Sequence, residues 1–140
     1  MSISLRGSVA IVGLGETAVG SLPDNGSTEI CAEAARLALL DAGLGKHQVD
    51  GLITCNPWVE PHLYHAEMFS EYMQIFPRFC MTLNAGGATS LTAVLRAASA
   101  IMTGVCETVL ITHGDNPRTG MSGRETGQKM TTTMNPQFEL

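Results

Sequence analysis

Two kinds of apolar pattern alternate along this chain, and the alternation predicts an α/β protein. Runs that are apolar at almost every position are typical of parallel strands covered on both faces. They lie at residues 8–13, 49–55, 79–84 and 107–114. Between them, apolar residues recur every three or four positions, as in amphipathic helices, over residues 27–43, 62–76 and 87–104. The order β-α-β-α-β-α-β predicts a mostly parallel sheet with helices on both faces.

Residues that begin and end helices agree with this division. Ser27 or Thr28 is placed to begin the first helix, and Gly43 is placed to end it in a left-handed conformation. Pro77 is expected to end the second helix, because the residue before a proline avoids the helical region. Gly104 closes the third helix. These signals predict three helices of useful length.

The last part of the chain has a different character. Residues 114–140 are rich in Gly, Thr, Ser, Asn and Met, and the apolar periodicity is lost. A loop of more than about 15 residues in a compact domain is usually functional or disordered. We therefore predict an α/β core over residues 1–113 and the start of a long excursion loop over residues 114–140.

Composition narrows the class of protein. The chain has 140 residues with 44% hydrophobic and 15% charged residues, which indicates a globular domain with one core. The net charge is −5 and the eight basic residues are scattered, so no basic stripe is present for nucleic acid. No apolar run reaches the roughly 18–20 residues of a membrane span, and no signal peptide is apparent. The cytoplasm is the expected location.

The four cysteines do not predict a metal centre. Cys31, Cys55, Cys80 and Cys106 form no CxxC pair and have no histidine at ligand spacing. Each lies in or beside an apolar strand or helix pattern. We therefore expect buried free thiols and no metal site.

A glycine motif near the N-terminus resembles a dinucleotide-binding loop. Residues 13–18, GLGETA, match G-x-G-x-x-G/A after the first predicted strand. In a dinucleotide-binding domain such a loop opens directly into a helix, whose N-terminus holds the pyrophosphate. Here the helix pattern begins about ten residues later, beyond Pro23. The sequence favours a glycine-rich turn and argues against a nucleotide site.

The junction between the third strand and the third helix is the main candidate site. At LNAGGATS, residues 83–90, the strand pattern meets Gly86 and Gly87 and a helix follows at once. The first amides of a helix lack intrahelical acceptors and can stabilise an anion. A Walker loop would need a lysine and a nucleophile elbow would need G-x-S-x-G; both are missing. Close packing of small residues on a sheet and a ligand site remain open alternatives.

The order of segments resembles the N-terminal half of the thiolase superfamily, specifically the sterol-carrier or lipid-transfer type. The resemblance is carried by VAIVGLGETAVG, AARLALLDAGLGKHQVDGLIT, LNAGGATSLTAVLRAASAIMTG and ETVLITHGDN, at residues 9–20, 34–54, 83–104 and 107–116. It implies one half of a duplicated, layered α/β sandwich in which each half contributes a helix to the middle layer. It also implies that a second thiolase half is absent from this chain.

This sequence differs from the family motif at the position of the family's nucleophile. The family motif is similar to Asn-x-x-Cys-x-Ser/Thr-Gly; Asn84 and Thr89 match it, and Ser90 stands at the usual Gly. Gly87 falls at the nucleophilic cysteine, so only its backbone amide could act, and no cysteine acyl-enzyme is expected. Cys80 lies seven residues earlier and does not replace that thiol. The implied substrate-binding residues are Asn84, Gly86, Ala88, Thr89 and His113.

The resemblance implies an enzyme of the acyltransferase or lyase class that acts on a coenzyme A thioester. Retro-aldol cleavage is favoured because it needs no covalent nucleophile. No covalently bound cofactor is expected. The implied partners are acyl-CoA, a second copy of the chain, and a small subunit of the zinc-ribbon and OB-fold type. The alternative is a non-catalytic acyl-CoA-binding or lipid-transfer protein, and the catalytic acid or base is expected in the absent half.

Overall fold

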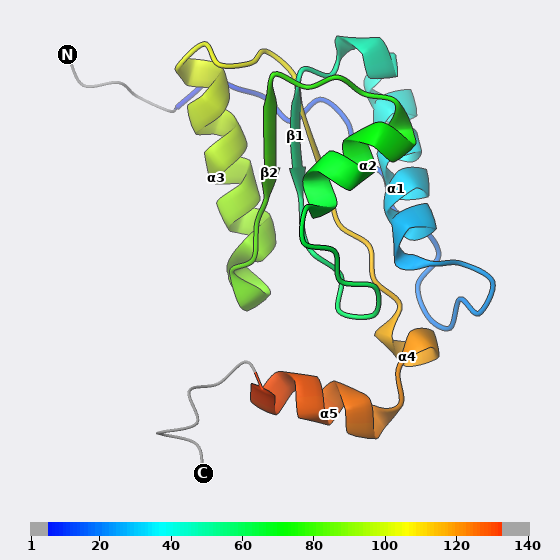
Figure 1. The fold of residues 1–140 in the computed structure, drawn as a ribbon. Helices are drawn as coiled ribbons and strands as arrows, with labels where there is room; N and C mark the ends of the chain where they lie inside the picture. The colour runs from blue at the N-terminus through cyan, green and yellow to red at the C-terminus, as the bar shows by residue number, and fades with distance from the viewer. Residues whose placement is uncertain (1–5, 133–140) are drawn as a thin grey trace.

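The fold is a three-stranded parallel sheet with helices on both faces, as a computed structural model that describes residues 6–132 shows (Figure 1). The strands are β1 (Gly51–Thr54), β2 (Phe79–Thr82) and β3 (Val109–Thr112), in the order β2-β1-β3. Gly51 pairs with Phe79 on one side and with Val109 on the other. The predicted α/β class is therefore confirmed. The outer parts of the predicted core and loop, residues 1–5 and 133–140, lie outside the described residues.

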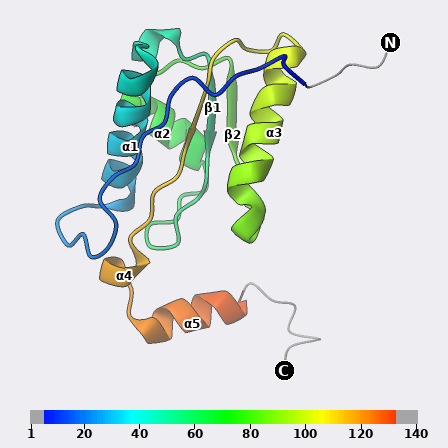
Figure 2. The same cartoon turned by 180° about the vertical axis from the view of Figure 1, so that it is seen from behind.

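Three helices cover this sheet. Helices α1 (Ser27–Ala42) and α2 (His65–Met73) lie on one face, and α3 (Thr89–Met102) lies on the other (Figures 1 and 2). Short 3₁₀ turns, η1 (Lys46–Gln48) and η2 (Gly86–Ala88), precede β1 and α3. Each parallel crossover thus passes through a helix, which is the usual way to join parallel strands.

Side chains that alternate along the strands form two cores. On the side of α1 and α2, a larger cluster contains Cys31, Ala35, Val49, Leu52, Phe69, Ile75 and Leu110. On the other side, Ile53 of β1 packs against Ala93 and Ala97 of α3. Small alanines let α3 approach the sheet closely. Its outer face is apolar and exposed at Leu91, Val94 and Leu95.

The first two helices end through left-handed residues. Gly43 has φ of 66° and its amide donates to the carbonyl of Leu40, so the predicted C-cap is confirmed. Helix α2 ends at Met73, three residues before its predicted end. Gln74 adopts φ of 54°, and the amide of Ile75 donates to the carbonyl of Ser70. Ile75 is only 3% exposed, so its burial in the core and this local turn end the helix before Pro77 is reached.

The predicted first strand is wrong. Residues 9–19 have no regular secondary structure, and β1 pairs directly with β3. The segment lies against α1 instead: a Cβ on Gly13 would lie 2.3 Å from the carbonyl oxygen of Ala38, and one on Gly15 would lie 2.2 Å from that of Ala34. These glycines serve close approach to a helix, and the amide of Leu14 donates to Asp41 Oδ2 at 2.9 Å. The apolar run is therefore not a sheet strand: its glycines lie against α1, while Ile11, Val12 and Leu14 are exposed.

The described part of the predicted excursion loop, residues 114–132, contains two helices. They are α4 (Pro117–Gly120) and α5 (Gly123–Thr132). At the start of α5, Ser122 and Glu125 form a reciprocal cap: the Ser122 amide donates to Glu125 Oε2 at 2.8 Å, and the Glu125 amide donates to Ser122 Oγ at 3.2 Å. This S-x-x-E capping box was visible in the sequence and favours a helix without any apolar periodicity.

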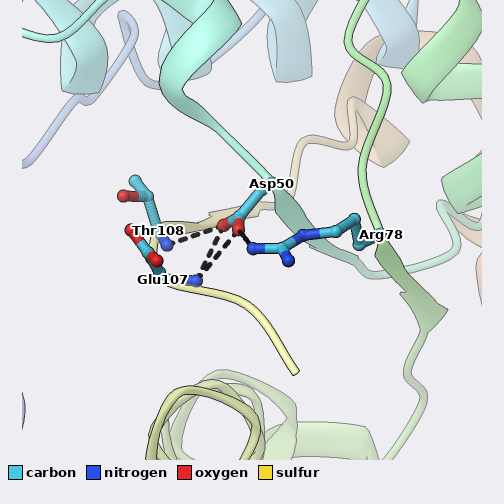
Figure 3. A network of polar contacts seen from close by, with 4 residues as sticks. All are labelled: Asp50, Arg78, Glu107 and Thr108. Atoms are coloured by element: carbon cyan, nitrogen blue, oxygen red, sulfur yellow. Dashed lines mark hydrogen bonds and ion pairs between the residues drawn. The ribbon is translucent and has the colours of Figure 1, made fainter. Parts of the chain in front are cut away.

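The amino ends of the three strands are joined through Asp50 (Figure 3). Its carboxylate accepts from the amides of Glu107 and Thr108 at 2.9 and 2.8 Å and from the Arg78 guanidinium at 2.5 Å. Burial alone would raise the pKa of this carboxyl, but these three donors outweigh it and hold the pKa below the ordinary 3.8. One side chain thus ties β1 to the segments that lead into β2 and β3.

Candidate functional site

The carboxyl ends of the strands present a row of threonines. Thr54, Thr82 and Thr112 are neighbours in the sheet register. Their hydroxyls contact, in that order, His65 Nδ1 at 2.9 Å, the amide of Ala66 at 2.9 Å and the carbonyl of Cys31 at 3.0 Å. All three therefore face α1 and α2. Because side chains alternate along a strand, the next residues, Cys55, Leu83 and His113, face α3.

The turn between β2 and α3 is fixed by Thr89. Its hydroxyl accepts from the amide of Ala85 at 2.9 Å and donates to the carbonyl of Gly86 at 2.7 Å. The first amide of this turn that donates to a backbone carbonyl belongs to Ala88, and its acceptor is the carbonyl of Ala85. The amides of Gly86 and Gly87 precede it and have no intrahelical acceptor. They lie at the positive end of α3, where a developing anion is stabilised.

Gly87 is not required by the backbone. Its φ lies outside the left-handed region, whereas Gly86 has φ of 56°. A Cβ built on Gly87 meets no atom within 4 Å. A larger residue would fit there without strain, so the glycine leaves open, exposed space above the helix tip. Of the predicted site residues, Asn84, Gly86, Gly87 and Ala88 are exposed and Thr89 is half-buried at this junction.

His113 is the predicted site residue that the turn does not contain. It follows β3 directly and is exposed. In the order β2-β1-β3, the end of β1 separates it from Asn84 at the end of β2. The structure therefore places His113 on the same face and at the same edge as the junction, across one intervening strand.

That intervening position is occupied by Cys55, which sequence reasoning treated only as a buried thiol. Cys55 is 9% exposed, and its Sγ lies 3.4 Å from Asn84 Oδ1. Burial raises the pKa of the thiol; a hydrogen bond to Thr89 lowers it less, and the charge of Asp115 adds to the rise. The thiol stays protonated at neutral pH, so Cys55 does not offer a thiolate nucleophile. The predicted second and third strands end at Cys55 and Asn84, so placing these strands side by side in the sheet would have predicted this contact.

The other cysteines lie away from the junction. Cys80 packs on the α1–α2 side of the sheet, and burial raises its pKa, so it cannot act at the tip of α3. Cys31, Cys55 and Cys106 are buried and all four thiols are free.

Within residues 6–132 no group of three His, Cys, Asp or Glu side chains is arranged to hold a metal ion. No helix in the same part of the chain is long and apolar enough to cross a membrane.

Two curated proteins are similar to this chain over most of its length. One, described as "17-hydroxy-3-oxo-4-pregnene-20-carboxyl-CoA lyase" of Mycobacterium tuberculosis, is 34% identical over 119 residues, which is 84% of this chain and 30% of the relative. The other, described as "Steroid side-chain-cleaving aldolase" of Thermomonospora curvata, is 30% identical over 119 residues, 84% of this chain and 29% of the relative. The chain thus spans about a third of these relatives. No protein-family model matches it.

Solved structures have the same fold. One described as "Ltp2-ChsH2(DUF35) aldolase" superposes with a TM-score of 0.71 at 27% identity and covers 91% of this chain and 33% of that one. A monomeric SCP2-thiolase-like protein of Mycobacterium smegmatis gives a TM-score of 0.59 at 21% identity, over 72% of this chain and 22% of that one. At 21% identity, the match to the SCP2-thiolase-like protein supports a shared fold only. The predicted resemblance is confirmed at the level of the fold: this chain has an α/β fold similar to part of these aldolase and thiolase-like structures.

Proposed function

We propose that the protein containing this chain cleaves a carbon–carbon bond in a β-hydroxyacyl-CoA by a retro-aldol step. The observation that carries the proposal is Gly87. It stands at the tip of α3 with open space around it and an amide that has no intrahelical acceptor. The position therefore offers oxyanion stabilisation and no nucleophile.

The relatives support a lyase over an acyltransferase. Their descriptions name a CoA lyase and a side-chain-cleaving aldolase, and the best-superposing structure cited above is described as an aldolase. Identities of 27–34% cover about a third of each of these proteins. The substrate of this protein, including any steroid part, is accordingly a proposal.

The chemistry requires three events. A base takes the proton from the β-hydroxyl, the Cα–Cβ bond breaks, and its electron pair moves to the thioester carbonyl to form an enolate. Protonation at Cα then yields the shortened acyl-CoA, and the β-carbon leaves as an aldehyde or ketone. The Gly87 amide and the α3 dipole would stabilise the enolate oxygen. His113 remains a candidate to line the same edge, and the base is expected outside this chain.

A partner subunit is part of the proposal. The similar structure is described as containing two named components, Ltp2 and ChsH2. A small subunit of the zinc-ribbon and OB-fold type would act with this protein. The homodimer that the family resemblance implies also remains a proposal.

The proposal is tested by product analysis. The full-length gene product, with any subunit that co-purifies, is incubated with β-hydroxyacyl-CoA substrates of several chain lengths and one with a steroid-like acyl group. We expect equimolar release of a carbonyl product and a shortened acyl-CoA. Absence of both products across all substrates would contradict the proposal.

The alternative is an acyl-CoA carrier without catalysis. It is favoured by the same open position at Gly87, which would admit a thioester carbonyl without reacting with it. This alternative predicts saturable acyl-CoA binding by calorimetry and an unchanged ligand after prolonged incubation. The product assay and the binding assay together separate the two functions.

A further inference from the structure

We propose that Cys55 is a positioning residue that orients the Asn84 carboxamide as a second oxyanion donor beside Gly87. This inference rests on the proposed lyase function and extends it by one residue from a neighbouring strand. Cys55 acts through Asn84 and does not itself contact substrate.

The first support is geometric. Cys55 Sγ lies 3.4 Å from Asn84 Oδ1, within the range of a thiol hydrogen bond. A second acceptor, the carbonyl of Asn56, is farther from the thiol, at 3.9 Å, and the Thr89 hydroxyl also lies within hydrogen-bonding reach of the sulfur. Cys55 is 9% exposed, whereas Asn84 is exposed to solvent. The contact therefore fixes one end of an exposed amide from a buried anchor.

The second support is the direction of the bond. Burial raises the pKa of the Cys55 thiol, so the sulfur carries its proton at neutral pH. An S–H group is a donor, and its partner is then the oxygen of the Asn84 carboxamide. The Nδ2 group consequently points away from Cys55. It has no acceptor among residues 6–132 and is left to donate to a ligand.

The third support is the position of Asn84 on the turn. Asn84 lies three residues before Gly87, and the turn between them is closed by the Ala88 amide and the Thr89 hydroxyl. Asn84 therefore directly precedes the hydrogen-bonded turn that carries the Gly87 amide at the tip of α3. Two donors held in advance stabilise a developing oxyanion better than one.

The test is a double-mutant cycle on the full-length gene product, with retro-aldol turnover and thermal unfolding as readouts. Asn84→Ala should lower kcat about 100-fold, as expected for an oxyanion donor. Cys55→Ala should lower kcat about tenfold with KM within about twofold, since only the orientation is lost. Cys55→Ser, which keeps a donor, should stay within about threefold of the wild type. The Cys55→Ala/Asn84→Ala variant should be no slower than Asn84→Ala.

A matched control uses a cysteine at the opposite edge of the sheet. Cys106 is 1% exposed and lies beside Gly51. Cys106→Ala should lower the melting temperature while leaving kcat unchanged. Additive losses in the cycle, or an equal loss in Cys55→Ser and Cys55→Ala, would overturn the role of Cys55 while leaving the lyase function standing. A wild type without turnover would overturn the lyase function, and this inference with it.

Discussion

The two ends of the same sheet are built in opposite ways. At the amino end, the carboxylate of Asp50 is satisfied by two backbone amides and by Arg78 (Figure 3). At the carboxyl end, the face toward α3 leaves the amides of Gly86 and Gly87 without intrahelical acceptors. Satisfied polar groups stabilise a fold, and preorganised unsatisfied donors can bind a ligand. We propose that stability and ligand chemistry are separated along the strands.

The separation follows from the topology. In parallel sheets the strands all end at one edge, where loops are free to vary and ligands bind. The opposite edge only has to hold the strands in register. Asp50 does so from the central strand, so that one side chain reaches the segments on both sides.

The largest expected effect is on the amino edge. Asp50→Ala removes the acceptor of the partly buried Thr108 amide, of the exposed Glu107 amide and of Arg78, so the free energy of unfolding should fall by about 3 kcal/mol in urea denaturation. Arg78→Ala is the control: its side chain is 62% exposed, and the loss should be below about 1 kcal/mol. Equal losses in the two variants would contradict the central role of the two amides.

A substitution at the carboxyl edge should change chemistry with little effect on stability. Gly87→Cys fits without backbone strain or steric contact, so the free energy of unfolding should change by less than about 1 kcal/mol. The new thiol lies at the positive end of α3, which lowers a thiol pKa and favours attack on a thioester. Incubation with acetyl-CoA should produce an acetylated protein in intact mass spectrometry. An unmodified protein would argue against thiolase-like geometry at this turn.

Acidification should weaken the two edges in separate pH ranges. Burial of the His65 imidazole, with His62 and His113 nearby, holds its pKa below the ordinary 6.5. The unfolded state therefore binds this proton more readily, and stability is lost as pH falls from 6.5 to the lowered value. Asp50 has its pKa held below 3.8, so its contribution is lost only as pH falls below that value.

Urea denaturation as a function of pH measures both losses. His65→Asn keeps a polar side chain near Thr54 but cannot titrate, so it should remove the loss that begins near pH 6.5 and leave the more acidic loss in place. A stability curve in His65→Asn that matches the wild type between pH 6.5 and 4 would contradict the assignment.

The smallest expected effect concerns the turn itself. Thr89→Val removes the hydroxyl that bonds to the Ala85 amide and the Gly86 carbonyl but keeps the side-chain shape. The free energy of unfolding should fall by about 1 kcal/mol. Ser90→Ala serves as the control, because Ser90 is exposed, and its effect should be within about 0.5 kcal/mol. A smaller loss in Thr89→Val than in Ser90→Ala would show that the turn does not depend on this hydroxyl.

Much of the core could be predicted because its signals are local. The runs around Leu52, Cys80 and Leu110 form strands, and the periodic stretches form α1, α2 and α3. The glycines at residues 86–87 marked the junction correctly. Helix α5 was missed for want of apolar periodicity, although Ser122 and Glu125 carried a local capping signal.

The first predicted strand failed for a different reason. Residues 8–13 have the composition of a buried strand, but a strand also needs a neighbouring edge to pair with. The segment does not pair with either outer strand of the β2-β1-β3 sheet, and Gly13 and Gly15 allow it to lie against α1 instead. Pairing is a property of the whole sheet, which local composition cannot report.

The sequence by itself determined the α/β class and the strand–glycine–helix junction, because both depend on residues close together in the chain. Only the tertiary structure decided that Cys55 lies between Asn84 and His113. It also decided that Thr54, Thr82 and Thr112 form a row facing α1 and α2, and that Asp50 joins three strands. These contacts join residues 11–81 positions apart, and register and strand order bring them together. The local sequence pattern cannot determine the strand order or the register, since both depend on which surfaces the folded chain buries.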